Sequence, residues 1–250
     1  LSKAPSKFTA LTTWLQERFG ISVTEFPDYR GTLIRQDDFA RTIALYSAIP
    51  QSTKSFLLGS VVAELCVRDL ISEEVTRARF KTKSAESIAR LALRNYFAGA
   101  LILAYDDFLK TAAETRHDIQ LLSNRLDASI ETVCHRLSTL QRPGAKGLPF
   151  YFVKIDRAGN VVKRHSATRF QFARFGGSCP RWNVHQAFEQ NSNKFTSQVA
   201  QMPDGVRYLC VATSITKHQP DYRSGERRYA LGIGCEVQYA DAVVYADGLA

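Results

Sequence analysis

Residues able to bind an anionic, aromatic ligand are concentrated between Lys146 and His185. These forty residues contain eight Lys and Arg side chains, one acid (Asp156) and seven aromatic rings, a local charge of +7 out of +9 for the whole chain. The segment Ser84–Leu140, in contrast, has six bases and seven acids. Positive charge interleaved with rings suits a ligand carrying phosphates and a flat base, either a small nucleotide-type molecule or a nucleic acid.

The run RFGGSCPRWN, residues 174–183, is the part least typical of an ordinary protein surface. Its glycines can take positive φ and allow a backbone to approach a ligand closely. Their N–H groups, with two arginines alongside, could hold an anion before a helix that starts near Asn183. Its rings could stack on a base or cover an acyl chain. The candidate residues here are Arg174, Phe175, Gly176, Gly177, Arg181 and Trp182.

A simpler interpretation of the basic segment is a solvated sheet face. In that case Lys154, Lys163, Arg164 and Arg169 point outward from strands whose other face is core. The alternation in FQFARF partly supports this, because Phe170 and Phe172 would share one face of a strand.

No arrangement of residues typical of an enzyme or a metal site is present in the sequence. None of the five histidines belongs to an HExxH pair, and no GxSxG, Walker or GxGxxG spacing occurs. Asp106 and Asp107 are adjacent and face different ways on a helix, which fits a solvated helix start better than catalysis. The five cysteines never form CxxC, which favours free thiols in a reducing cytoplasm. We therefore predict no catalytic residue, no metal site and no enzyme activity.

The expected elements predict an α+β fold, helix-rich first and sheet-rich second. Helical spacing predicts helices over 7–19, 52–79, 84–101, 105–114, 118–126 and 129–140. Gly20 is expected to end the first of them as a C-cap. Extended segments are predicted over 21–26, 32–35 and 41–46, and strands over 150–155, 161–165, 170–175, 206–213 and 229–236, with a helix near 183–190. The boundary lies at 142–146 and precedes a mixed, largely antiparallel sheet with flanking helices. The longest apolar run, 97–105, is far shorter than the roughly 20 residues that span a bilayer, so no membrane partner is expected.

The segment 118–140, DIQLLSNRLDASIETVCHRLSTL, has the outline of a helix-turn-helix. A DNA-reading role would place Ser129–His135 in a major groove. Its second helix, however, exposes Glu131 early and has Arg136 as its only firm cation, so it would meet phosphates with little positive charge. A packed helical hairpin is the favoured interpretation.

Several segments resemble a family of bacterial transcription regulators that respond to short-chain fatty acyl-CoA, including regulators of propionate (methylcitrate) and acetate metabolism. These segments are CHRLSTLQRPGAKGLPFYFVKIDRAGNVVKRHSATRFQFARFGGSCPRWNVHQAF, MPDGVRYLCVA and YALGIGCEVQYADAVVYADG. The resemblance runs from about Ser84 to the C-terminus, and the block Arg136–Phe188 is its most specific part.

The resemblance implies a domain order. Residues 1–143 would be a helical scaffold similar to IrrE/ImmA-type metallopeptidases, with ALRNYFAGALILAYDDFL matching the helix after their metal site. Ser52–Leu65 lacks the HExxH of those enzymes, so zinc proteolysis is not expected. Residues 144–250 would sense acyl-CoA. A helix-turn-helix domain is expected before Leu1, and a cysteine-rich motif for an iron–sulfur cluster after Ala250, so neither belongs to this chain.

The resemblance therefore implies a cytoplasmic, homodimeric transcription regulator that binds a short-chain acyl-CoA, propionyl-CoA or similar, as effector and DNA through a domain outside this chain. It would control genes of short-chain fatty acid metabolism. The alternatives are a nucleic-acid-binding module that uses the basic sheet, or a residual acyl-CoA or metal-dependent hydrolase. The residues expected to bind the ligand are Lys163, Arg164, Arg169, Phe172, Arg174, Phe175, Gly176, Gly177, Arg181 and Trp182. Among them Lys163, Arg164, Arg169 and Arg174 are expected to contact phosphates.

Overall fold

The computed structural model describes residues 6–29, 31–170, 172, 179, 181–190, 193–218 and 226–249. The chain forms two compact units, Leu1–Ala104 and Tyr105–Ala250. The boundary expected from sequence, at 143/144, follows the change from helix to strand. The compact units divide earlier, because the helices that follow Ala104 belong with the sheet of the second unit. None of the helices in the described ranges is long and apolar enough to cross a membrane.

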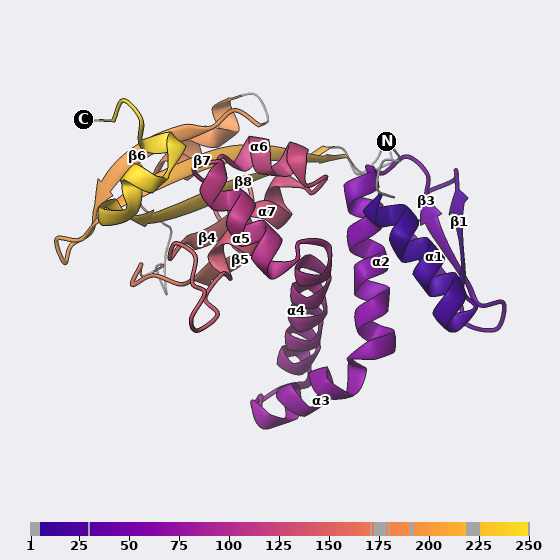
Figure 1. The fold of residues 1–250 in the computed structure, drawn as a ribbon. Helices are drawn as coiled ribbons and strands as arrows, with labels where there is room; N and C mark the ends of the chain where they lie inside the picture. Colours follow the sequence, from indigo (N-terminus) through magenta and orange to yellow (C-terminus); the bar gives the residue numbers. More distant parts are fainter. Residues whose placement is uncertain are drawn as a thin grey trace. The chain divides into compact units, whose positions relative to one another are not determined.

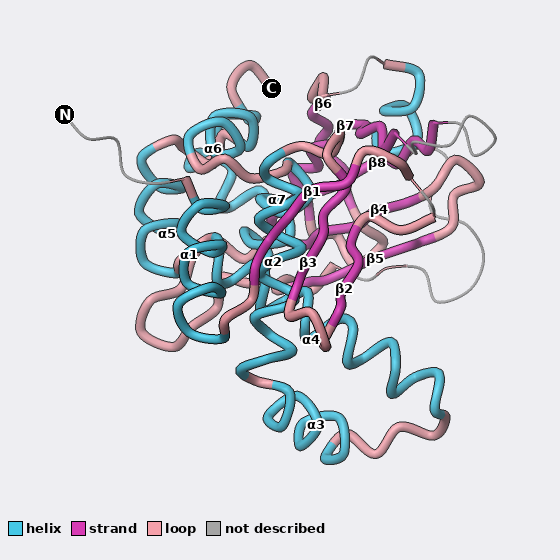
Figure 2. Tube along the Cα trace, turned by 90° about the vertical axis from the view of Figure 1, so that its right-hand side faces the viewer, coloured by secondary structure: helices cyan, strands magenta, loops and turns pink. Residues whose placement is uncertain are grey.

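The first unit has a three-stranded sheet in the order β1-β3-β2 (Figure 2). Strand β1 (Ser22–Phe26) is parallel to β3 (Thr42–Tyr46), and β2 (Ile34–Asp37) is antiparallel to it. Helix α1 (Lys7–Phe19) begins at the cap Ser6 and ends at Gly20, whose φ of 65° is the left-handed conformation predicted for this position. The apolar sides of the sheet, of α1 and of α2 (Gln51–Cys66) form one core around Leu15, Leu45 and Leu58.

The prediction of a single helix over 52–79 is wrong. Val67, with φ −131° and ψ 17°, separates α2 from α3 (Arg68–Arg77). Helix α4 (Lys83–Ile102) starts one residue before the expected Ser84 and is capped by Thr82. Helices α2 and α4 pack closely at Gly59, where a Cβ atom would lie 3.2 Å from Ala98.

The second unit contains a five-stranded sheet in the order β5-β4-β8-β7-β6, with all neighbouring strands antiparallel, and three helices that precede it in the chain (Figure 1). The predicted α+β class and the largely antiparallel sheet are confirmed. The helices are α5 (Tyr105–Glu114), α6 (Ile119–Arg125) and α7 (Ile130–Ser138). The strands are β4 (Tyr151–Ile155), β5 (Val161–Ser166), β6 (Thr196–Gln201), β7 (Arg207–His218) and β8 (Glu226–Glu236).

Both faces of this sheet are covered, which explains why every residue of β4 is buried. Helix α7 packs on β4, β5 and β8, and we call this side, which carries Phe152 and Lys154, the helix face. The other side carries Tyr151, Val153 and Ile155 and is covered by Phe170, Phe172, Trp182 and the short helices α8 (Asn183–Gln186) and η1 (Ala187–Glu189). We call it the aromatic face.

The strands differ from the prediction in two places. Strand β6 was not predicted. A strand was expected over 170–175, but Phe170 and Phe172 lie outside any strand, and the other residues of that segment lie outside the described ranges.

Strand β8 contributes Gly234 opposite Tyr151. A Cβ atom at Gly234 would collide with the Leu209 carbonyl and the Tyr151 ring, so glycine is required for that ring to occupy its position.

Candidate ligand-binding site on the aromatic face

Aromatic rings form a continuous cluster on the aromatic face. Phe170 stacks on Tyr151, with ring centroids 4.1 Å apart and an angle of 23° between the planes. It also contacts Tyr208 at 5.1 Å, Phe172 at 5.1 Å and Trp182 at 5.7 Å. Trp182 is only 8% exposed, whereas Phe170 and Phe172 are partly exposed. The rings that a ligand can reach are therefore the two phenylalanines, and Trp182 is chiefly a core side chain beneath them.

Polar atoms inside this cluster lack hydrogen bonds. The Tyr151 hydroxyl and the Trp182 indole nitrogen are buried without a hydrogen-bond partner among the described residues. Burial raises the pKa of Tyr151 and of the Cys210 thiol next to it, so both groups are neutral at pH 7. These polar atoms lie beneath the two phenylalanines and are part of the core of the sheet.

Three of the predicted cations border the aromatic cluster. The guanidinium carbon of Arg164 lies 6.0 Å from the centre of the Phe172 ring. Arg169 and Arg181 are exposed and directly precede Phe170 and Trp182 in the chain. Arg164 thus lies at the edge of the rings, and Arg169 and Arg181 are exposed next to them along the chain. The predicted residues Arg174, Phe175, Gly176 and Gly177 lie outside the described residues.

Lys163 does not join this group. It lies opposite Lys154 in the β4–β5 pair, while Arg164 lies opposite Val153. Since neighbouring residues of a strand point to opposite faces, Lys163 is on the helix face and Arg164 on the aromatic face. Lys163 and Arg164 therefore cannot belong to one binding site on a single face of the sheet.

The helix face holds a cluster of charges instead. Glu131 of α7 accepts hydrogen bonds from Lys154 Nζ at 3.0 and 3.1 Å and pairs with Lys217 Nζ at 2.8 Å. The Lys154 side chain is only 7% exposed and lies 4.2 Å from the centre of the Tyr229 ring. The prediction that Lys154 points into solvent is wrong. The prediction that Glu131 is exposed is also wrong, because its side chain is only 18% exposed.

Burial and charge compete in this cluster. Burial alone would raise the pKa of Glu131, but the charges of Lys217 and Lys154 lower it to about 2. Burial lowers the pKa of Lys154 to about 8, although Glu131 opposes the shift. The carboxylate is thus ionised at all ordinary pH values, and it holds Lys154 in the charged form near neutrality.

Two histidines lie beside these charges. The rings of His135 on α7 and His165 on β5 have centroids 6.0 Å apart, and His135 meets Phe152 edge-on at 5.9 Å. Burial, and then the charge of Lys163, lower the pKa of His135 to about 3. The same two causes lower the pKa of His165. Both rings are therefore neutral at pH 7.

We expect the protein to lose stability as the pH falls below 6.5, in part through His135. The unfolded chain protonates this residue near its ordinary pKa of 6.5, whereas the folded chain does so only near 3. Stability that is present above pH 6.5 is thus lost on acidification, by about 1.4 kcal/mol per pH unit for this one residue. Urea unfolding of the parent and of His135→Gln between pH 7 and 5 measures the difference in slope. Parallel slopes would show that His135 is protonated equally in both states.

The helix-turn-helix interpretation of 118–140 conflicts with the packing of α7. Ile130, Val133 and Leu137 are buried, and the first turn of the helix faces the sheet through Glu131. The residues that would enter a major groove are therefore covered by the protein itself. The segment is a packed helical hairpin.

The described part of the chain contains no group of three or more His, Cys, Asp or Glu placed to hold a metal ion. All five cysteines are free thiols, and Cys134, Cys210 and Cys235 are buried. Burial raises the pKa of the Cys235 thiol to about 12, which makes it unreactive.

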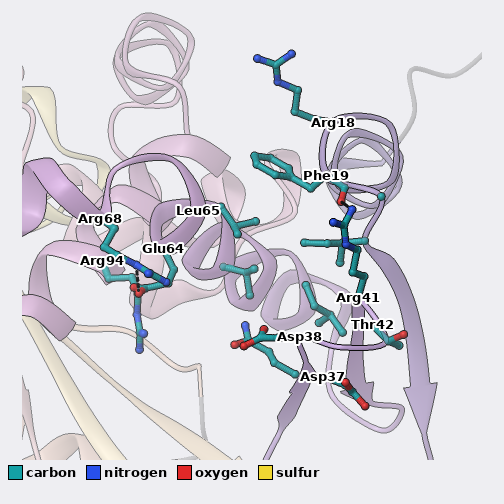
Figure 3. A pocket seen from close by; sticks show the side chains of 15 residues that line it. Arg18, Phe19, Asp37, Asp38, Arg41, Thr42, Glu64, Leu65, Arg68 and Arg94 are labelled. Carbon is teal, nitrogen blue, oxygen red and sulfur yellow. Dashed lines mark hydrogen bonds and ion pairs between the residues drawn. The ribbon is translucent and has the colours of Figure 1, made fainter.

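Two clefts lie away from the predicted residues. The first, of about 800 Å³, is in the first unit and is lined by the end of α1, the β2–β3 turn, α2 and α4. Figure 3 shows two groups of charged side chains on opposite sides of it: Glu64, Arg68 and Arg94, and Asp37, Asp38 and Arg41. Arg68 pairs with Glu64 at 2.7 Å, and the buried Nε of Arg94 has no hydrogen-bond partner among the described residues. No local sequence pattern indicates this cleft, because its arginines are scattered from residue 18 to residue 94.

The second cleft, of about 620 Å³, is in the second unit. It lies between the α5–α6 turn and residues 146–149 and contains the buried His117, whose Nδ1 is 3.0 Å from the Ala242 carbonyl. Arg116 beside it forms a double hydrogen bond with Asp247, at 2.9 and 2.7 Å. These contacts fix the end of the described chain to the α5–α6 turn.

Comparison with known proteins gives two family models that together cover most of the chain. Residues 139–250 match the model "Short-chain fatty acyl coenzyme A regulator, C-terminal", and residues 16–138 match "IrrE N-terminal-like domain". The chain is 51% identical over 240 residues to the propionyl-CoA carboxylase regulator of Cereibacter sphaeroides, covering 96% of this chain and 50% of the relative. It is 41% identical to the HTH-type transcriptional regulators RamB and PrpR of Mycobacterium tuberculosis, covering 96% of this chain and 50% and 49% of those proteins.

A solved structure described as a Mycobacterium tuberculosis transcriptional regulator is also similar. It superimposes with a TM-score of 0.93 at 38% identity, over 99% of this chain and 75% of that one. The chain spans about half the length of the curated relatives it matches. The first of these relatives is named a regulator, and the other two and the structural neighbour are named transcriptional regulators.

Proposed function

Because the chain belongs to the short-chain fatty acyl-CoA regulator family, we propose that it is the ligand-sensing region of a transcription regulator of short-chain fatty acid metabolism. The proposed effector is a short-chain acyl-CoA, propionyl-CoA or a close analogue. The regulator would act in the cytoplasm as a homodimer and would bind DNA through a helix-turn-helix domain outside this chain.

The chemistry of coenzyme A supports this choice of ligand. It carries a 3′-phosphate and a pyrophosphate that need Lys or Arg, an adenine that needs a ring or guanidinium to stack on, and an acyl tail that needs an apolar surface. The observation that carries the proposal is the set of exposed arginines bordering partly exposed rings on the aromatic face. In this proposal Arg164, Arg169 and Arg181 contact phosphates and Phe172 covers the base or the acyl chain. Arg174, Phe175, Gly176 and Gly177 remain proposed contacts.

Acyl-CoA would regulate by favouring one conformation of the whole protein. A ligand shifts a conformational equilibrium only by the difference between its affinities for the two states. The same difference then changes the affinity for the operator, since coupling between two sites is reciprocal.

Calorimetric titration of the chain with acetyl-, propionyl-, butyryl- and free CoA tests the proposal. We expect saturable binding that differs between acyl chains, by about 1–3 kcal/mol per methylene. Absence of binding to all four compounds would contradict the proposal. A parallel titration with an arbitrary DNA duplex addresses the alternative. Binding with a steep salt dependence, and no response to CoA esters, would favour a nucleic-acid module.

A further inference from the structure

Lys163 differs from the other lysines of the helix-face cluster. It lies on the edge strand β5, opposite Lys154, and its side chain is partly exposed. Opposed residues of an antiparallel pair have Cβ atoms about 4.5–5.5 Å apart, so the two ammonium groups share one neighbourhood. Glu131 is already paired with Lys154 and Lys217. Within the described part of the chain, Lys163 forms no hydrogen bond or ion pair.

A base with a free nitrogen lies next to Lys163. His165 is two residues along β5 and therefore on the same face. Its ring is neutral at pH 7, and its Nδ1 is buried without a hydrogen-bond partner among the described residues. The imidazole of His135, also neutral, is 6.0 Å from it. Both rings therefore carry an unprotonated nitrogen at pH 7, and their basicity rises when Lys163 is uncharged, because the positive charge of Lys163 is one cause of their lowered pKa.

The charges around Lys163 favour its uncharged amine. Burial lowers the pKa of Lys163, Glu131 opposes this, and the positive charge of Lys217 adds to it. The titratable and charged groups that face this cluster are Glu131, His135 and Arg136 on α7, Lys154 on β4, His165 on β5, Lys217 on β7 and Tyr229 on β8. Lysines next to other cations in a desolvated site are the ones that act as nucleophiles.

The two neighbouring lysines are not suited to this role. Lys154 is only 7% exposed and is held by both oxygens of Glu131. Lys217 is paired with Glu131, and its pKa is raised even though burial lowers it, because Glu131 outweighs that effect. Lys163 alone of the three combines partial exposure with freedom from a carboxylate partner.

We propose that Lys163 is a nucleophilic lysine that takes the acyl group of a short-chain acyl thioester, so that the protein acylates itself. The uncharged Nζ attacks the thioester carbonyl carbon, a C–N bond forms and the C–S bond breaks. The proton lost by the amine passes to the imidazole of His165 and then to the departing thiolate, which leaves as a thiol. No oxidant, reductant or other reactant is needed. The inference rests on the proposed function only for the identity of the thioester as an acyl-CoA.

Peptide mass spectrometry of the chain after incubation with two thioesters tests this. S-propionyl-N-acetylcysteamine has no nucleotide and reports amine reactivity alone, and propionyl-CoA is the proposed natural donor. We expect acylation at Lys163 several-fold faster than at Lys83, because burial lowers the pKa of Lys163 and so leaves more of it as the free amine. Lys83 is the matched control because its side chain is 95% exposed and only weakly paired, at 3.5 Å from Glu86.

Three variants identify the groups involved. Lys163→Arg keeps the charge and should abolish this signal, while Lys83→Arg should leave it unchanged. His165→Gln should slow acylation at Lys163 without changing the rate at Lys83. If Lys163 reacts no faster than Lys83 with either thioester, the inference is wrong whatever calorimetry shows. If Lys163 reacts rapidly with both while calorimetry detects no binding of CoA esters, the inference stands and the proposed function fails.

Discussion

Replacing Glu131 with glutamine lowers the free energy of unfolding by about 3–5 kcal/mol, the usual cost of removing one partner of a buried ion pair. Lys154, 7% exposed, would lose the carboxylate that pairs with it, and Lys217 would lose its pairing at 2.8 Å. The remaining positive charges would then face one another in a region of low dielectric constant. Urea denaturation at pH 7 measures the change.

Two further variants separate the buried pair from a general effect of charge. Glu114→Gln removes one carboxylate of a helix pair that is 3.9 Å long and more than half exposed on both sides. It should change stability by no more than about 0.5 kcal/mol. The double variant Glu131→Leu with Lys154→Met should recover most of the loss, because an apolar pair avoids the desolvation cost of both ions. A Glu131→Gln protein as stable as the Glu114→Gln protein would refute this account of the helix face.

Replacing Arg164 or Arg169 with alanine weakens acyl-CoA binding by about 10- to 100-fold each, while the fold is retained. A hydrogen bond to a charged group contributes about 1.5–3 kcal/mol, and about 1.4 kcal/mol corresponds to a factor of ten in Kd. Both side chains are exposed at the edge of the aromatic cluster, so their loss creates no cavity. Calorimetric titration with propionyl-CoA measures the effect.

Arg157→Ala is the matched control, because Arg157 is an exposed arginine in the β4–β5 turn of the same sheet. Its affinity for propionyl-CoA should stay close to that of the parent. Parent-like binding by Arg164→Ala and Arg169→Ala would move the site away from the aromatic face. The cleft of the first unit, with Arg41, Arg68 and Arg94, would then be the next place to look.

Local patterns predicted much of the fold. The helix over 7–19 ends at Gly20 as expected, since apolar spacing and a C-terminal glycine are both local signals. The break at Val67 carries no Gly or Pro signal, so local sequence patterns do not predict it. Strand β6, sequence TSQVAQ, has no strong apolar alternation and becomes a strand through pairing with β7.

The site was harder to predict because a charge count along the chain ignores which way side chains point. Lys163 and Arg164 are neighbours in sequence, yet a strand sends them to opposite faces. The partner of Lys154 is Glu131, 23 residues away, and Lys217 joins the same carboxylate from β7. These groups come together only in the folded sheet. Because Lys154 is paired with Glu131 there, it is not available to bind a ligand.

Binding of acyl-CoA at the rings of the aromatic face is tested most directly by the fluorescence of Trp182. The sequence contains two tryptophans, and Trp14 is 38% exposed on α1, so Trp14→Phe leaves Trp182 as the single indole at little structural cost. Propionyl-CoA added to this variant should change the Trp182 emission, saturating at the Kd found by calorimetry. Calorimetric binding with no change in Trp182 emission would contradict a site at these rings.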